Sequence, residues 1–386
     1  SVLFAATSHA MINPLVAIFV HDYLHSSLEE VGIIISVLFF SAFLAKIPIG
    51  LLLKSNRILL TLTVSTVIIT IIPYLYSIAD SLETMIIFRV IGGVGMALHF
   101  ISGLSSISLV SDRNDSGKTM LTYTAIISIG LVIGPGISSI LVEIIGIRGT
   151  FIAASLIALP SVLFSLFAYR NRVNTIQEYV RPSFKDIKNI LTNSTFRSAI
   201  LPYSIYAIVN SVLLAYGTLL GKSAYGLSES NISGLFFGYF ILAAIFRISL
   251  SRIHERIPIR LGLIVGLSVG FFGLLVMGFV QNSSLFQIAF LSIGISHGLV
   301  FPLSSVLVIR ATSNQNRVIA NTIFGAHWDI GQMFGPLLVS AIISSLGLFL
   351  AIGFISLFPF VGMTLLTLLG IKMVYRNKGF DGDLRT

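Results

Sequence analysis

A few ionisable side chains lie within long apolar stretches of the sequence, where charge is costly and is usually kept for function. Asp329 is the only acidic residue near the middle of any of these stretches. A carboxyl group removed from water disfavours its charged form and can therefore exchange a proton near neutral pH. Asp329 is our first candidate for a proton-coupling residue. The alternative is a structural role, as a partner for an arginine or histidine of another helix.

Histidines at similar depth are further proton-coupling candidates, because imidazole titrates near physiological pH. We assign this role to His9, His99 and His297, with ordinary hydrogen bonding as the alternative for each. A fourth, His327, lies two residues from Asp329 and therefore on a different face of a helix. None of these spacings is typical of a metal site, and the sequence contains no cysteine. We therefore expect no metal and no cofactor.

Other polar residues in the apolar stretches could contact a substrate. Arg89 keeps its charge, so it could bind an anionic group or neutralise an acid; an arginine that reaches the headgroups is the alternative. Lys46 and Arg247 lie near the ends of their stretches, and we expect both to extend toward the headgroups. The remaining substrate candidates offer hydrogen bonds or aromatic surface, with core packing as the alternative: Asn13, Tyr203, Tyr206, Asn210 and Trp328.

Composition identifies the class of protein that positions these residues. Of the 386 residues, 55% are hydrophobic and only 10% are charged, whereas soluble domains contain about 25% charged residues. This excludes a cytosolic enzyme, a disordered protein and a nucleic-acid-binding protein. A membrane-spanning helix needs about 20 apolar residues. Twelve such blocks occur, at roughly 3–22, 31–53, 58–79, 84–110, 119–145, 150–169, 199–221, 230–250, 260–280, 285–309, 318–345 and 348–374.

The basic residues predict the orientation of these blocks. Lysine and arginine accumulate in loops on the cytoplasmic side of a membrane. If both termini are cytoplasmic, all but five of the 24 basic residues fall in cytoplasmic segments; the exceptions are Lys46, Arg89, Arg148, Lys222 and Arg247. The net charge of +9 therefore indicates a multi-pass protein of the plasma (inner) membrane, in contact with the lipid bilayer and with no nucleic-acid partner.

One polar, basic connection divides the chain. We predict an N-terminal six-helix bundle at 1–170, a cytoplasmic linker at 171–198 and a C-terminal six-helix bundle at 199–386. Within the linker, apolar residues recur at helical spacing beside Lys185 and Lys188. This pattern is typical of an amphipathic helix on the membrane surface, and a solvated linker is the alternative.

The two halves repeat each other. Gly130, Gly134 and Pro135 match Gly331, Gly335 and Pro336 at an offset of 201 residues, and another glycine follows each match, at Gly146 and Gly347. A repeat in register predicts two halves related by an axis along the membrane normal, with a binding site between them. The glycines allow close helix packing and the prolines bend the helix. We interpret this motif as one that sets the conformation, with packing alone as the alternative.

The sequence resembles the Major Facilitator Superfamily over nearly its whole length. Asn13-Pro14 resembles the first helix of that family, Arg89-x-x-x-Gly93-x-Gly95 its fourth-helix motif, and Gly130-x-x-x-Gly134-Pro135 the fifth-helix motif of exporters. The sequence departs from the family at Lys54, where an acid is expected, at Ser138 and Ser139, which replace two glycines, and in the absence of an acid from the first block.

The resemblance implies an all-α membrane protein of twelve helices in two six-helix bundles related by pseudo-two-fold symmetry. It also implies that helices one, four, seven and ten line a central cavity, which would bring His9, His99 and His297 to its wall. The implied function is secondary active transport of a small molecule by alternating access, with a proton or another ion as the coupling partner. A proton-coupled exporter of amphipathic or drug-like compounds, acting as a monomer, ranks first. A symporter or uniporter for a sugar, organic anion or other metabolite ranks second, and a sensor or lipid-moving role third; we expect no enzymatic activity.

Overall fold

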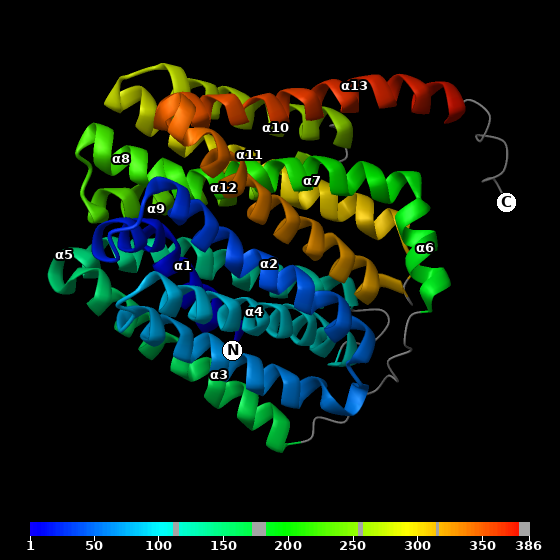
Figure 1. Cartoon of the computed structure of the whole chain (residues 1–386). Coiled ribbons are helices and arrows are strands. Elements are labelled where there is room, and N and C mark those ends of the chain that lie inside the picture. The colour runs from blue at the N-terminus through cyan, green and yellow to red at the C-terminus, as the bar shows by residue number, and fades with distance from the viewer. Residues whose placement is uncertain (111–115, 172–182, 254–257, 314–315, 378–386) are drawn as a thin grey trace, which may run out of the picture.

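The computed structural model describes residues 1–110, 116–171, 183–253, 258–313 and 316–377. These residues form helices joined by short connections, with no β-strand among them (Figure 1). The first part of the chain contains α1 (Val2–Ile18), η1 (Phe19–Tyr23), α2 (Leu28–Leu52), η2 (Ser55–Arg57), α3 (Ile58–Ser77), α4 (Leu82–Val110) and α5 (Ser116–Arg170). The second contains α6 (Phe184–Thr192), α7 (Ser194–Val212), η3 (Leu213–Gly217), α8 (Thr218–Tyr225), α9 (Glu229–Ile253), α10 (Ile259–Phe279), α11 (Ser283–Ala311), α12 (Arg317–Ile355) and α13 (Leu357–Asn377).

Ten helical stretches of the described residues are long and apolar enough to cross a membrane. Two of them, Thr122–Arg170 and Ile319–Leu368, are 49 and 50 residues long, enough for two crossings each. Each contains one residue with non-helical backbone angles, Gly146 (φ 69°, ψ 179°) or Gly347 (φ 74°, ψ 167°). Only glycine adopts this conformation readily, so each glycine separates two crossings. The twelve predicted segments and the all-α fold are confirmed.

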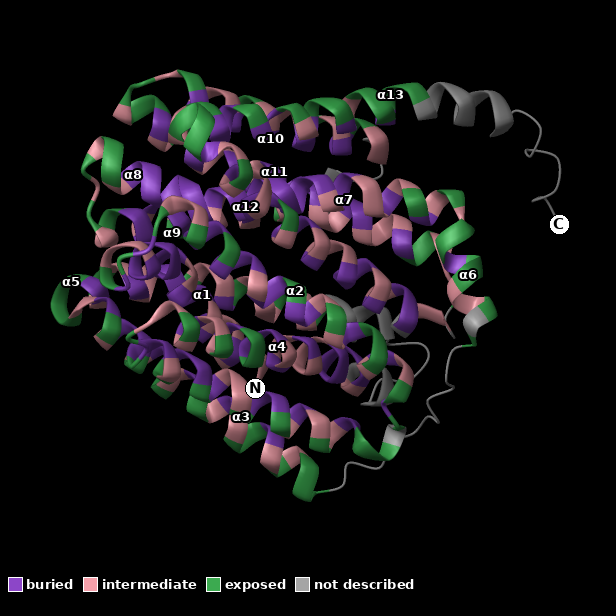
Figure 2. Ribbon diagram, viewed as in Figure 1, coloured by how far each residue is buried: buried purple, intermediate pink, exposed green. Residues whose placement is uncertain are grey.

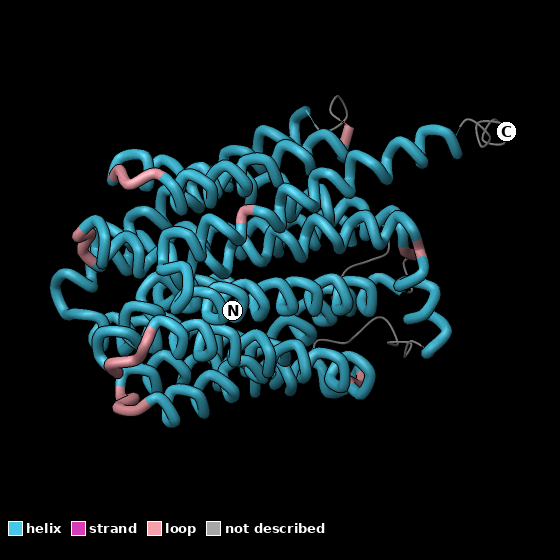
Figure 3. Tube along the Cα trace, turned by 45° about the horizontal axis from the view of Figure 1, so that its top comes forward, coloured by secondary structure: helices cyan, strands magenta, loops and turns pink. Residues whose placement is uncertain are grey.

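The outward surface of the bundle is apolar. Ile144, Leu52 and Phe167 expose 72%, 70% and 68% of their surface, and exposed residues lie along the outer faces of the helices (Figure 2). Apolar surface of this extent requires a nonpolar environment. The helices run side by side, and most of the loops between them lie at the two ends of the bundle (Figure 3). The chain is therefore a multi-pass membrane protein.

The glycines of the repeated motif pack the helices within each half. A β-carbon at Gly134 would lie 2.6 Å from the carbonyl oxygen of Thr7 on α1. A β-carbon at Gly335 would lie 2.8 Å from the carbonyl oxygen of Ile208 on α7. The fifth helix of each half thus lies against the first helix of the same half, as a parallel repeat requires.

The two halves meet along two pairs of helices, α2 with α12 and α5 with α9. The α2–α12 pair is antiparallel, because Ser340 Oγ donates to the carbonyl of Glu29 (2.8 Å) and Ser36 Oγ donates to the carbonyl of Met333 (2.8 Å). The numbering on α12 falls as that on α2 rises. Further along α2, residues 46–50 therefore face the part of α12 that contains Asp329.

The linker predicted at 171–198 contains α6, and its residues 172–182 lie outside the described part of the chain. Ser183 caps α6: the backbone N–H of Asp186 donates to Ser183 Oγ (3.2 Å), and hydrogen bonds from Ser183 hold the pKa of Asp186 below its ordinary value. Ile190 is buried in a cluster with Phe196 of α7 and Ile319 of α12. Ile190 and the partly buried Ile187 of α6 thus pack on the protein, whereas Leu191 of the same helix is 38% exposed. The next helix, α7, begins at Ser194 because Asn193 caps it.

Candidate functional site

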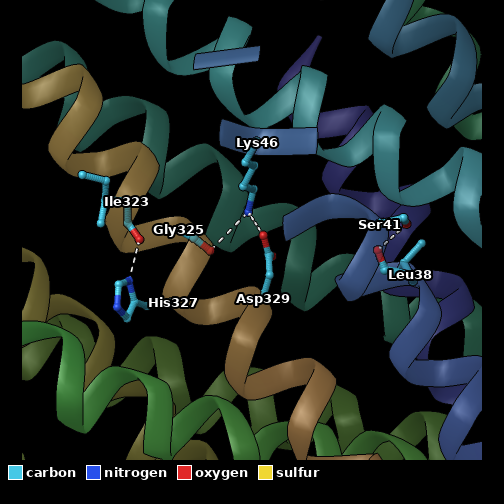
Figure 4. A network of polar contacts seen from close by, with 7 residues as sticks. All are labelled: Leu38, Ser41, Lys46, Ile323, Gly325, His327 and Asp329. Atoms are coloured by element: carbon cyan, nitrogen blue, oxygen red, sulfur yellow. Dashed lines mark hydrogen bonds and ion pairs between the residues drawn. The ribbon is translucent and has the colours of Figure 1, made fainter. Parts of the chain in front are cut away.

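Asp329 forms an ion pair with Lys46, a residue of the other half. Lys46 Nζ lies 2.5 Å from Asp329 Oδ2, and only 4% of the lysine side chain and 1% of the aspartate side chain are exposed. Lys46 also donates a hydrogen bond to the carbonyl of Gly325 (3.2 Å), and its ammonium lies 4.6 Å from the centre of the Phe100 ring. Figure 4 shows the lysine reaching from α2 to α12 at this point.

The expectation that Lys46 extends toward the headgroups is therefore wrong. The distance of Lys46 from the end of its helix suggested a headgroup contact, but the antiparallel α12 places a carboxylate opposite it. The partner of Asp329 is a lysine, and not the arginine or histidine expected for a structural role. His327 lies on a different face, as predicted, and donates from Nδ1 to the carbonyl of Ile323 on its own helix (2.8 Å; Figure 4).

A chain of hydrogen bonds connects buried polar residues of the second half. His297 Nδ1 lies 2.8 Å from Tyr206 Oη, which also contacts Tyr239 Oη. Asn210 donates to Tyr239 Oη (2.9 Å), and Gln332 donates to Asn210 Oδ1 (2.7 Å). The structure thus brings three predicted residues together and adds Tyr239 and Gln332, which were not predicted from the sequence. Gln332 lies three residues after Asp329, so this chain begins one helical turn from the ion pair.

Aromatic rings of α7 and α12 pack together near this chain of hydrogen bonds. The Tyr203 ring stacks on Phe324, with their centres 4.0 Å apart, and lies 5.2 Å from Trp328. Trp328 also lies 5.9 Å from Tyr206. The three predicted aromatic residues, Tyr203, Tyr206 and Trp328, therefore form one cluster near Asp329, a surface suited to apolar organic groups.

The candidates of the first half have surroundings of their own. Arg89 is 4% exposed, and its guanidinium lies 5.4 Å from the centre of the Tyr76 ring; it is buried in the protein and does not reach the headgroups. His99 Nδ1 lies 3.3 Å from Ser65 Oγ of α3. His9 and Asn13 are half-buried on α1. The glycines of the Arg89 motif pack closely, since a β-carbon at Gly93 would contact α2 and one at Gly95 would contact Ile68 of α3.

Arg247, like Lys46, contacts a residue of the other half. Its guanidinium donates to Ser128 Oγ of α5 and lies 5.3 Å from the centre of the Phe301 ring. These contacts contradict the expectation that Arg247 extends to the headgroups. Ser128 precedes the glycine motif of α5, just as Asp329 precedes that of α12.

A polar cluster joins the two halves at the other end of the bundle. Lys222 of α8 lies 2.6 Å from Asp22 of η1 and also pairs with Glu229 of α9. Both acids and the lysine are about one-third exposed. Among the described residues, no group of three or more histidine, aspartate or glutamate side chains could hold a metal ion.

The sequence contains a signal for the ion pair, because Lys46 and Asp329 are opposite charges at membrane depth. A buried charge is tolerated mainly when it is paired. We interpreted each of these charges separately, whereas the two together suggest the pair. The sequence contains no such signal for Tyr239, because a tyrosine in an apolar helix can serve in packing as readily as in a chain of hydrogen bonds.

Comparison with known proteins relates this architecture to a family. The family model described as "Major Facilitator Superfamily" matches residues 1–269 and 222–379. Multidrug resistance protein 2 of Bacillus subtilis (strain 168) is 23% identical over 306 residues, covering 76% of this chain and 73% of that protein. Multidrug resistance protein MdtG of Citrobacter koseri is 25% identical over 338 residues, covering 84% of this chain and 80% of that protein.

Two solved structures share the fold at low identity. A bacterial homolog to the human lysosomal transporter Spinster, in an inward-facing and unoccupied conformation, superposes with a TM-score of 0.72 and 13% identity, covering 95% of this chain and 94% of that one. The human organic anion transporter MFSD10 (TETRAN) superposes with a TM-score of 0.69 and 16% identity, covering 95% and 96%.

Proposed function

Because the chain belongs to the Major Facilitator Superfamily and is a secondary transporter of two six-helix halves, we propose that it exports amphipathic, drug-like compounds in exchange for protons. The buried pair of Lys46 and Asp329 carries this proposal. It is the one place in the described residues where a carboxylate at membrane depth connects the two halves. If Asp329 gains or loses a proton, the attraction between the two halves at this position changes.

The proposed coupling follows from the charges of the pair. When Asp329 is ionised, its attraction to Lys46 holds this part of α2 against α12. A proton on Asp329 removes the attraction and leaves the Lys46 ammonium without a counter-charge, which favours separation of the two helices. Each proton that moves down a membrane potential contributes about 2.3 kcal/mol per 100 mV. One such proton can therefore drive a compound outward against its gradient.

The substrate class is supported by the surroundings of the pair and by the relatives. Tyr203, Phe324 and Trp328 offer aromatic surface beside Asp329, and binding sites for small organic molecules combine such surface with a few polar groups. Two relatives that match most of this chain are named multidrug resistance proteins.

The proposal also covers the domain bounds, the orientation in the membrane and the remaining site residues. The bundles are residues 1–170 and 199–386, joined by the linker at 171–198, with both termini in the cytoplasm and the protein acting as a monomer. His9, His99 and His297 remain candidates for proton transfer, and Arg89, Asn13, Tyr206 and Asn210 for substrate contact. The end of the bundle that carries α6 is then cytoplasmic, and the end that carries α8, with Lys222, faces outward (Figure 1).

The test is internal pH in proteoliposomes, measured with a pH-sensitive dye while a panel of amphipathic compounds is added. We expect compounds to trigger proton movement in the native protein and not in the Asp329→Asn variant. Glu83→Gln is the matched control, because it removes a carboxylate at the start of α4, away from the ion pair. Proton movement that persists in Asp329→Asn would eliminate Asp329 as the coupling residue and redirect the proposal to the histidines.

A second candidate function is symport or uniport of a polar metabolite such as a sugar. The hydrogen-bonded chain from His297 to Gln332 favours it, because hydroxyl, amide and imidazole groups suit a substrate rich in hydroxyls. The same proteoliposomes separate the two functions. Uptake of a radiolabelled sugar without proton movement, together with no response to amphipathic compounds, would favour the second.

A further inference from the structure

The repeat extends to the helices on which Lys46 and Arg247 lie. Helices α2 and α9 are both 25 residues long and begin 201 residues apart, at Leu28 and Glu229. The serine before each helix caps it in the same way: Ser27 Oγ accepts from the backbone of Glu30, and Ser228 Oγ accepts from that of Asn231. The offset equals that of the glycine motif. Lys46 and Arg247, also 201 residues apart, are therefore equivalent positions.

The contacts of these two basic residues are equivalent as well. Lys46 reaches from α2 to Asp329 of α12, and Arg247 reaches from α9 to Ser128 of α5. Ser128 and Asp329 are again 201 residues apart. The two interfaces between the halves thus use the same pair of positions. At one interface the basic residue meets a carboxylate, and at the other it meets a hydroxyl group.

Arg247 is consequently a half-buried cation without a protein counter-ion among the described residues. The three ion pairs there involve Lys46 and Lys222 only. Arg247 Nε is buried and has no hydrogen-bond partner among the described residues. The ring beside it is Phe301, and Ser128 contributes only a hydroxyl. A guanidinium group has a planar set of donors that matches a carboxylate, and burial strengthens such a contact.

We propose that Arg247 and Ser128 form the binding subsite for an oxyanion, such as a carboxylate, on the exported compound. The substrate anion would take the place that Asp329 holds at the equivalent interface. This inference rests on the proposed export function and specifies its substrate class as amphipathic organic anions. The aromatic rings of Phe301 and Tyr203, whose centres lie 5.8 Å apart, extend from the guanidinium toward Trp328 and provide surface for the apolar part.

The test compares two probes that differ only in charge. The probes are 11-(dansylamino)undecanoic acid and its primary carboxamide, added to the full chain in nanodiscs of zwitterionic lipid at pH 7.5, with empty nanodiscs subtracted. Trp328 is the only tryptophan of the chain, so energy transfer from it to the dansyl group reports binding near the proposed subsite. We expect the carboxylate to bind at least about 10-fold more tightly than the carboxamide, as a charged hydrogen bond provides.

Two pairs of variants test the subsite itself. Arg247→Gln should remove the preference for the carboxylate over the carboxamide, while Arg247→Lys should keep a preference. Ser128→Asp should install the counter-ion that the other interface has, and should also remove the preference for the carboxylate. Ser128→Asn introduces a side chain of nearly the same shape as aspartate but without charge, and should retain the preference. Because Ser128→Asp leaves Arg247 in place, the proposal stays testable if Arg247→Gln does not fold.

Equal affinity of the native protein for the two probes, or a preference that survives both Arg247→Gln and Ser128→Asp, would overturn the proposal. Binding is measured without a proton gradient, so its result is separate from coupling. A carboxylate preference without compound-driven proton movement would support the subsite and contradict proton exchange. Proton movement without a carboxylate preference would do the reverse.

Discussion

Lys46 and Asp329 lie 283 positions apart in the sequence, yet their charged atoms are 2.5 Å apart and almost completely buried. The pair joins the second helix of one half to the fifth helix of the other. Removing both charges from such a site is often tolerated, whereas removing one leaves a buried charge without a partner. In the proposed mechanism, a single proton on Asp329 therefore weakens the contact of α2 and α12.

Single neutralisation of the pair should destabilise the protein more than double neutralisation. We expect Lys46→Met or Asp329→Asn alone to cost about 3–5 kcal/mol, and the double variant to cost less than the sum of the two. Thermal unfolding of the purified variants in one detergent measures this. Lys54→Met is the matched control, because Lys54 is exposed and its loss should leave the midpoint nearly unchanged. Additive losses in the double variant would show that the two side chains do not interact.

The glycines at the helix contacts should be intolerant of even one added methyl group. Gly134→Ala and Gly335→Ala place a carbon against the backbone of the neighbouring helix, and overpacking of this kind costs about 1–3 kcal/mol. Gly234→Ala is the control, because nothing lies within 4 Å of a β-carbon there. Thermal unfolding should rank Gly234→Ala as the most stable of the three. A Gly335→Ala variant as stable as Gly234→Ala would contradict the close packing of α7 on α12.

The fold could be predicted from the sequence because each membrane-spanning helix is recognisable from its own residues alone. A helix that crosses lipid needs a continuous apolar block, so the blocks could be counted without knowing their neighbours. Gly146 and Gly347 were recognisable as equivalent because they follow the same motif at the same distance. Their role as breaks between crossings follows from their positive φ angles, which the structure provides.

The site could be predicted only in part, because its contacts are between distant segments. Asp329 stood out by its depth, but the choice of Lys46 as its partner depends on the antiparallel course of α2 and α12. Counting residues from the end of a helix placed Lys46 at the headgroups, which is wrong. The equivalence of Lys46 and Arg247 was present in the sequence at the repeat offset. Only the structure shows that these two equivalent residues contact equivalent partners, Asp329 and Ser128.

The two breaks should be sensitive to any side chain for a different reason from the packing glycines. Nothing lies within 4 Å of a β-carbon at Gly146 or Gly347, so alanine there would meet no neighbour. The cost should come from the positive φ combined with an extended ψ, which costs about 1–3 kcal/mol for residues other than glycine. Thermal unfolding of Gly347→Ala should show this loss. Gly226→Asn is the control, since φ 63° and ψ 24° form the left-handed conformation that asparagine tolerates; equal stability of the two variants would contradict the argument.

In the proposed orientation, the cluster of Lys222, Asp22 and Glu229 should hold the outer ends of the two halves together. Its side chains are about one-third exposed, and a pair in that setting contributes no more than about 1 kcal/mol. Lys222→Gln should therefore shift the equilibrium toward the outward-open state by up to about 5-fold. A cysteine at Ser340, which hydrogen-bonds across the α2–α12 contact, reports this, since the native chain has no cysteine to interfere. We expect a membrane-impermeant maleimide to label Ser340→Cys up to about 5-fold faster when Lys222→Gln is present. Lys185→Gln, on the exposed side of α6, should leave the rate unchanged, and equal rates in all three backgrounds would show that the cluster does not control the outer contact.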